Sequence, residues 1–108
     1  GAKVISQSWG GGPYNAALAA ATQRARAAGV IVVSAAGNYS ADTDSTPFYP
    51  AGYAAQADNV VSVAASGRDD RLAGFSNFGR TSVTLAAPGV NINSTLPGGR
   101  FGLKSGTS

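Results

Sequence analysis

The feature that most restricts the fold is a run of four β-branched residues, Val30-Ile-Val-Val33, without a polar interruption. It follows an alanine-rich segment that predicts a helix from its N-cap, Asn15, to about Ala28, with Gly29 as the glycine that ends it. An apolar strand directly after a helix is typical of a parallel sheet that is buried on both faces. We therefore expect an α/β fold.

Further strands are predicted from alternating or β-branched residues on either side of this unit. They cover residues 2–8, 59–65 and 82–87, with a short extended piece at 90–95. A glycine-rich turn at 97–99 leads from there to the end of the sequence, and the many Gly, Asn, Ser, Asp and Pro residues of 37–59 predict a long irregular loop. Three or four strands, about three of them parallel, are expected.

One property of this pattern predicts an incomplete domain. A parallel sheet needs helices on both faces, but the 108 residues contain only one convincing helix. The sequence also opens on a strand and stops at Ser108, immediately after a Gly-Thr pair. We expect residues 1–108 to form part of a three-layer, mostly parallel α/β fold that is truncated at both ends.

The composition excludes several kinds of function. The chain has no cysteine, which rules out disulfides and thiolate metal sites, and no histidine, which rules out a histidine general base within it. Its net charge of +3 comes from eight scattered basic residues, whereas nucleic-acid binding usually needs a cluster. No apolar run approaches the roughly 20 residues of a membrane span. We therefore expect neither nucleic acid nor a membrane as a partner.

Four segments resemble the subtilisin-like (subtilase) family of serine proteases, in the order of that family. They are Ser6-Gln-Ser-Trp-Gly-Gly11, Ser34-Ala-Ala-Gly-Asn38, Phe75-Ser-Asn-Phe-Gly79 with Leu85-Ala-Ala-Pro-Gly89, and Ser94-Thr-Leu-Pro-Gly98 leading to Ser105-Gly-Thr-Ser108. Each segment alone is weak, but the four together cover nearly the whole chain. The resemblance implies a subtilisin-like fold, with residues 1–108 as the C-terminal portion of a peptidase domain that ends at its nucleophile.

The resemblance implies catalytic roles for two residues. Ser108 matches the nucleophile, and Asn38 matches the asparagine whose side chain donates a hydrogen bond to the oxyanion, together with the backbone N–H of Ser108. Apart from the resemblance, Ser108 is only a terminal residue, and Asn38 is a type of residue that often stabilises a turn. Asn38 follows a buried strand, however, and open α/β sheets hold their sites at that carboxyl end.

A cleft for a polypeptide substrate is implied as well. Residues matched to the edge that pairs with the substrate backbone are Ser8, Trp9 and Gly10, and those matched to a wall of the primary specificity pocket are Ser34, Ala35, Ala36 and Gly37. A lone tryptophan can also be a core residue, so Trp9 has two interpretations. Phe48 stands where relatives commonly carry a small residue, and we expect it to shorten the pocket and favour small or medium side chains.

The resemblance implies no cofactor for the chemistry, although a structural calcium is possible in the full-length family domain. Candidate oxygen ligands for a monovalent-ion or calcium site are the carbonyls of Ala51 and Tyr53, with which the carboxylates of Asp42, Asp44 and Asp58 could be recruited. Their spacing does not match a dedicated calcium loop. Tyr49-Pro50 occupies the place of a cis-proline turn in many family members.

The catalytic histidine and aspartate of the family are expected upstream of residue 1, so residues 1–108 alone are expected to be inactive. The full-length enzyme is expected to be an extracellular monomer. Two other functions stay open. One is a non-catalytic subtilase homologue, against which the intact Ser108 and Asn38 argue. The other is a Rossmann-like nucleotide-binding module, but glycines 10–12 do not form G-x-G-x-x-G and no acidic residue follows the second strand where a ribose ligand is expected.

Overall fold

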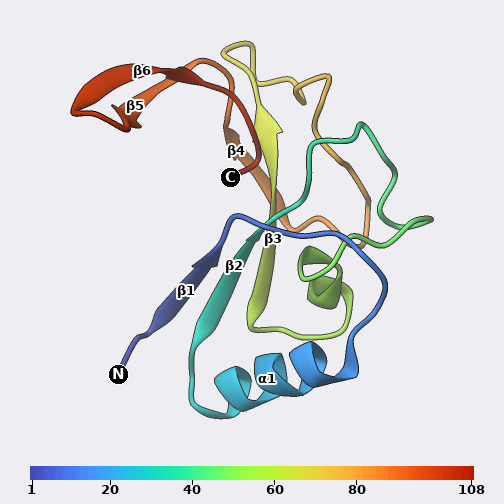
Figure 1. The fold of residues 1–108 in the computed structure, drawn as a ribbon. Coiled ribbons are helices and arrows are strands. Elements are labelled where there is room, and N and C mark those ends of the chain that lie inside the picture. Colours follow the sequence, from blue (N-terminus) through green and yellow to red (C-terminus); the bar gives the residue numbers. More distant parts are fainter.

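The computed structural model describes residues 1–108 and contains a parallel sheet, one α-helix, a 3-10 helix and a β-hairpin (Figure 1). The elements in chain order are β1 (Val4–Gln7), α1 (Ala16–Ala27), β2 (Ile31–Ala35), η1 (Ala51–Ala55), β3 (Val60–Ser66), β4 (Leu85–Pro88), β5 (Ile92–Leu96) and β6 (Arg100–Lys104). No helix has both the length and the apolar character that a membrane crossing needs.

The main sheet has four strands in the order β1-β2-β3-β4, and all neighbouring strands are parallel. Val32 of β2 lies beside Val60 of β3, and Val63 of β3 lies beside Leu85 of β4. The expected α/β class with a mostly parallel sheet is therefore confirmed. All four carboxyl ends point to the same edge, which places the loops after β1 and β2 next to each other.

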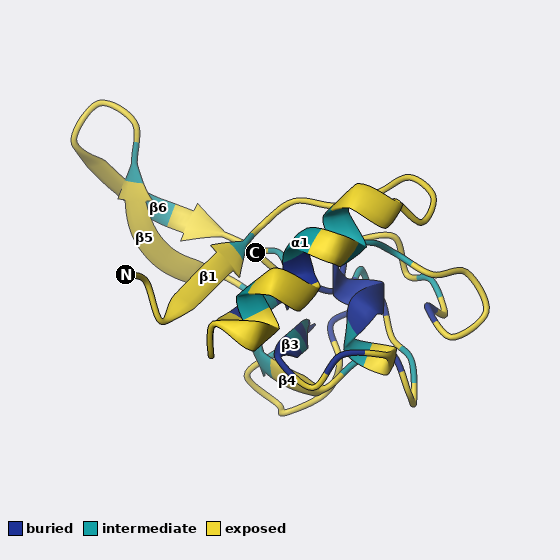
Figure 2. Cartoon of the chain, turned by 90° about the horizontal axis from the view of Figure 1, so that it is seen from below, coloured by how far each residue is buried: buried dark blue, intermediate teal, exposed yellow.

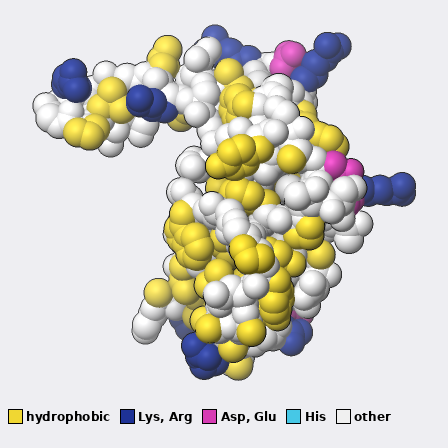
Figure 3. Space-filling view, turned by 45° about the vertical axis from the view of Figure 1, so that its right-hand side comes forward, with side chains coloured by type: hydrophobic (Ala, Val, Ile, Leu, Met, Phe, Trp, Pro, Cys, Tyr) yellow, Lys and Arg dark blue, Asp and Glu magenta, His cyan; other side chains and the backbone are white.

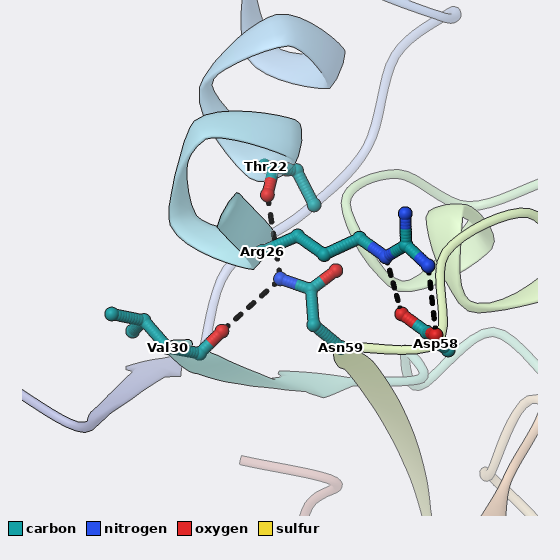
Figure 4. A network of polar contacts seen from close by, with 5 residues as sticks. All are labelled: Thr22, Arg26, Val30, Asp58 and Asn59. Carbon is teal, nitrogen blue, oxygen red and sulfur yellow. Dashed lines mark hydrogen bonds and ion pairs between the residues drawn. The ribbon is translucent and has the colours of Figure 1, made fainter. Parts of the chain in front are cut away.

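Helix α1 begins and ends where its capping residues predict. The Asn15 side chain accepts a hydrogen bond from the Leu18 N–H at 2.9 Å, and Gly29 follows the helix with φ of 70°. Figure 4 shows the hydrogen bonds that connect the end of α1 to the sheet. There the Asn59 side-chain amide donates to the carbonyls of Thr22 and Val30, at 3.3 and 3.1 Å.

The core lies between the sheet and a layer made of α1 and η1 (Figure 2). Its apolar cluster consists of Val32, Tyr53, Ala57 and Val60. The Tyr53 hydroxyl donates to the Asn15 carbonyl at 2.8 Å, so η1 also holds the start of α1. The prediction of 37–59 as irregular throughout was wrong at η1, because this alanine- and glycine-rich turn is stabilised by packing rather than by a repeating pattern.

The other face of the sheet carries apolar side chains that no helix of residues 1–108 covers. Because side chains alternate along a strand, the neighbours of the buried Val32 and Val60 point to this second face. Val4, Ile31 and Leu85 lie there with exposed fractions of 55%, 47% and 48%. The structure thus contains a sheet and one helical layer.

The hairpin β5–β6 extends away from this body (Figures 1 and 2). The strands pair antiparallel from Ile92–Lys104 to Leu96–Arg100, and the turn between them holds Gly98 and Gly99 at positive φ. The sequence predicted the first strand and the turn but not β6. A glycine at the centre of β6, Gly102, weakens its strand pattern. The prediction of three or four strands was therefore too low, since the chain has six.

Candidate active site

Three distant segments meet at the carboxyl edge of the sheet. Residues 8–10 follow β1, residues 36–38 follow β2, and residues 106–108 return from the hairpin. Figure 1 accordingly shows the C-terminus beside the carboxyl ends of the strands. The Gly106 N–H donates to the Gly89 carbonyl at 2.9 Å, which attaches the returning segment to the end of β4.

The Asn38 carboxamide is held in one orientation by Thr107. Its Oδ1 accepts from the backbone N–H and from the hydroxyl of Thr107, both at 2.9 Å. The same hydroxyl accepts from the Gly37 N–H at 3.1 Å. With Oδ1 engaged twice, Nδ2 of Asn38 donates no hydrogen bond within the chain, and neither does the backbone N–H of Ser108. Two donors are thus free beside the exposed Ser108.

A cavity of about 310 Å³ opens between the three segments. It is lined by Ser8, Trp9, Gly10, Ala35, Gly37, Asn38, Tyr39, Phe48, Thr107 and Ser108. Trp9 is 54% exposed at its edge, so the interpretation as a core tryptophan is wrong. Tyr39 and Thr107 were missed from the sequence, although both directly follow or lie within the quoted motifs.

Two of the residues expected in the pocket wall, Ser34 and Ala36, do not line this cavity. Ser34 is buried in the sheet, where its hydroxyl donates to Gln7 Oε1 at 3.1 Å. It lines an adjoining cavity of about 180 Å³, which shares Ser8, Ala35, Thr107 and Ser108 with the larger one. Ala36 is 1% exposed and lines neither cavity. Successive side chains of an extended segment point to opposite sides, so Ala35 and Gly37 form the wall while Ser34 and Ala36 point away from the cavity.

The ring of Phe48 lies against the backbone on both sides of the cavity. A Cβ added at Gly37 would lie 3.1 Å from Phe48 Cε1, and one added at Gly10 would overlap the ring and lie 2.8 Å from the Tyr49 carbonyl oxygen. Gly10 is therefore required by close approach rather than by its backbone angles. Tyr39 covers the ring from the solvent side, with the two ring centroids 5.8 Å apart.

The candidate calcium ligands take part in other interactions. The Tyr53 carbonyl accepts from the N–H groups of Gln56 and Ala57, both at 2.9 Å. Asp44 accepts hydrogen bonds from the Ser82 hydroxyl and from three consecutive backbone N–H groups. These hydrogen bonds lower the pKa of Asp44, and the one from the Ser82 hydroxyl has the largest effect. The hydrogen bond from Arg26 lowers the pKa of Asp58 (Figure 4).

No three acidic, histidine or cysteine side chains of the chain gather as a metal site. A structural calcium elsewhere in the full-length domain stays a prediction. The Tyr49-Pro50 peptide bond is cis, as the resemblance implied.

Comparison with known proteins gives matches over the full chain. The subtilase family model matches residues 1–108. A thermophilic serine proteinase of Bacillus sp. (strain AK1) is 45% identical over 108 residues, which are 100% of this chain and 25% of the relative. Subtilisin E of Bacillus subtilis (strain 168) is 40% identical over 106 residues, 97% of this chain and 26% of the relative.

A more distant relative is subtilisin-like protease 2 of Plasmodium falciparum (isolate 3D7), which is 36% identical over 111 residues. The alignment includes 99% of this chain and 8% of that relative. The chain thus spans about a quarter, or less, of the length of these relatives.

Proposed function

The chain belongs to the subtilase family, and we propose that it supplies the nucleophile and the oxyanion hole of a serine endopeptidase. The observation that carries this proposal is the pair of free donors beside Ser108, the Nδ2 of Asn38 and the backbone N–H of Ser108 itself. Donors that are already oriented stabilise negative charge without reorganising during the reaction.

In the proposed reaction the Oγ of Ser108 attacks the carbonyl carbon of the scissile peptide bond and gives its proton to a general base. The carbonyl oxygen becomes an oxyanion, which accepts hydrogen bonds from the two free donors. The C–N bond then breaks, and the leaving amine takes the proton from the base. An ester on Ser108 remains, and water hydrolyses it through a second oxyanion in the same hole.

The general base comes from outside residues 1–108 in this proposal. The chain contains no histidine, and the subtilisin order places the aspartate and histidine before the serine. A serine hydroxyl without its base is a poor nucleophile at neutral pH. Residues 1–108 on their own are therefore expected to show no peptidase activity and no labelling of Ser108 by a fluorophosphonate.

The proposed substrate is a polypeptide with a small or medium side chain before the scissile bond. Support comes from Phe48, whose ring reduces the space between Gly10 and Gly37. Profiling the full-length enzyme on a peptide library tests this, with Phe48→Gly as the variant that should accept larger side chains. A preference of the unchanged enzyme for Phe or Tyr would contradict it.

The central test uses the full-length protein that contains these residues. A fluorophosphonate should label Ser108, and Ser108→Ala should lose both the label and peptide hydrolysis. Ser45→Ala, which changes another exposed serine of the chain, is the matched control and should retain both. A full-length protein that folds but neither reacts nor hydrolyses peptides would favour the non-catalytic homologue instead.

The remaining properties of the full-length protein are proposed from family membership. We propose a monomeric, extracellular enzyme with no nucleic-acid partner. On the face shown in Figure 3, the Lys and Arg side chains lie apart from one another, some on the hairpin β5–β6 and others around the rest of the molecule. Nucleic-acid binding usually needs a clustered basic surface, and this distribution does not form one. Size-exclusion chromatography and fractionation of the source cells test the first two properties.

A further inference from the structure

Asn77 is a buried polar residue that the proposed reaction does not use. Its side chain is 1% exposed and is among the largest that are fully buried in the molecule. It belongs to the Phe75–Gly79 segment, outside any helix or strand. A buried carboxamide needs hydrogen-bond partners, so the groups that it contacts show what it holds in place.

All hydrogen bonds of the Asn77 side chain go to the segment that contains Asn38. Its Nδ2 donates to the Ala36 carbonyl at 2.8 Å, and its Oδ1 accepts from the N–H groups of Tyr39 and Ala41 at 2.9 and 3.1 Å. Its backbone N–H donates to the Gly37 carbonyl at 2.9 Å. Asn77 therefore binds the chain on both sides of Asn38.

We propose that Asn77 is a positioning residue for the oxyanion hole, which fixes residues 36–41 so that Nδ2 of Asn38 faces Ser108. This inference rests on the proposed function. Thr107 orients the Asn38 side chain and also accepts from the Gly37 N–H. Backbone hydrogen bonds from the Ala36 N–H to Val63 and from the Ser40 N–H to Phe75 hold the same segment. Among side chains, Asn77 contributes three hydrogen bonds to this backbone and Thr107 one. Thr107 thus acts mainly on the carboxamide of Asn38, and Asn77 acts on the backbone that carries it.

The shape and chemistry of Asn77 leave little room for a substitute. A carboxamide donates and accepts at once, and here it must do both, whereas a carboxylate would lose the donor and add a buried charge. Gly37 has φ of 105°, and a Cβ there would overlap Asn77 Nδ2. The close contact of these two residues means that a shift of one displaces the other.

The expected effect follows from the narrow geometry of an oxyanion hole. A donor is effective about 2.7–3.1 Å from the developing charge, and a misplacement of about 1 Å can cost a large part of the rate. Without the carboxamide, one carbonyl and two N–H groups on either side of Asn38 lose their partners, which lets the backbone at Asn38 shift. We expect Asn77→Ala to lower kcat about tenfold or more with little change in KM.

The test measures kcat and KM in the full-length enzyme and combines Asn77→Ala with Asn38→Ala. In the Asn38→Ala background, Asn77→Ala should change kcat by less than about twofold, because the donor that it positions is absent. The control is Thr43→Val, which removes a buried hydroxyl bonded only to Phe78 and Ser82 and should leave kcat within about twofold. A kcat in Asn77→Ala within about twofold of the parent overturns the inference, as does an equal loss in both backgrounds.

A second measurement tests the inference if Asn77→Ala does not fold or if the full-length protein has no peptidase activity. Hydrogen exchange in the full-length protein should show protected N–H groups at Tyr39 and Ala41. In Asn77→Ser this protection should be lost, and in Thr43→Val it should remain. Equal protection in both variants overturns the inference, whereas a lack of activity with the expected exchange pattern counts against the proposed function alone.

Discussion

Two regions of the molecule are held together in different ways. In the helix-covered sheet (β1 to β3 with α1 and η1), an apolar cluster that includes Val32 and Val60 forms the core, and hydrogen bonds such as those of Asn59 supplement it. In the polar frame (residues 36–48 and 75–82), the buried side chains are mostly polar. Thr43, Asn77 and Ser82 are all nearly or fully buried there and bond to one another's segments.

The difference bears on what each region can tolerate. Loss of an apolar contact costs free energy of unfolding in proportion to the surface and cavity involved, while the neighbours relax only partly. Loss of a buried hydrogen-bonding side chain leaves its partner groups unsatisfied and lets a loop move. We therefore expect substitutions in the sheet to change stability, and substitutions that remove hydrogen bonds to residues 36–41 to change the site first.

Replacement of Asn38 should give the largest effect on kcat. Asn38→Ala removes an exposed donor, so in the full-length enzyme it should lower kcat by about 10²–10³, the range already established for a subtilisin's own oxyanion-hole asparagine. The midpoint of thermal unfolding should fall only slightly, because the side chain buries little surface and its loss leaves just the two donors of Thr107 without their acceptor. Steady-state kinetics measures kcat, and calorimetry measures the midpoint of thermal unfolding. A variant with normal kcat would show that Asn38 has no role in the mechanism.

A substitution in the helix-covered sheet should instead lower stability and leave kcat nearly unchanged. Val60→Ala deletes two methyl groups from the apolar cluster and should lower the free energy of unfolding by about 2 kcal/mol. Denaturant unfolding of the full-length protein measures this, and kcat should stay within about twofold. A large loss of kcat at unchanged stability would contradict the expectation that the helix-covered sheet controls stability and the polar frame controls the site.

Acid should affect the polar frame through Asp44. Its pKa is lowered in the folded state, so its contribution to stability is present above the unfolded pKa, near 4, and is lost as the pH falls through the folded value. The difference in unfolding free energy between the parent and Asp44→Asn should therefore be constant at neutral pH and shrink below about pH 4. Denaturant unfolding across this range checks the trend, and a difference that grows in acid would contradict it.

The smallest effect is expected for the ion pair at the surface of the helix-covered sheet. Arg26 and Asp58 have side chains that are 52% and 73% exposed, and exposed pairs contribute little. Asp58→Asn should change the midpoint of thermal unfolding slightly at low salt and not at all at high salt. Asp44→Asn is the comparison, because neutral N–H and hydroxyl groups hold Asp44 and its effect should depend less on salt.

The same division explains what the sequence could predict. The strands around Val32 and Val60 and the capping of α1 at Asn15 depend on neighbours close in the chain, and local patterns reveal those. Ser108 and Asn38 could be predicted as site residues because each lies in a short motif of the family. Asn77 was found only as part of a framework signature, since its partners lie 36 to 41 positions away in the sequence. Strand β6 was missed because its pairing with β5, rather than its own composition, makes it a strand.

The uncovered face of the sheet has a consequence for the handling of residues 1–108 on their own. Val4 and Ile31 present apolar surface beside the unpaired edge of β1, and Leu85 adds to it on β4. A net charge of +3 provides little mutual repulsion between molecules. Such a molecule should be colloidally unstable. It should scatter light increasingly with concentration, bind hydrophobic dyes, and give refolding yields that fall as the protein is made less dilute.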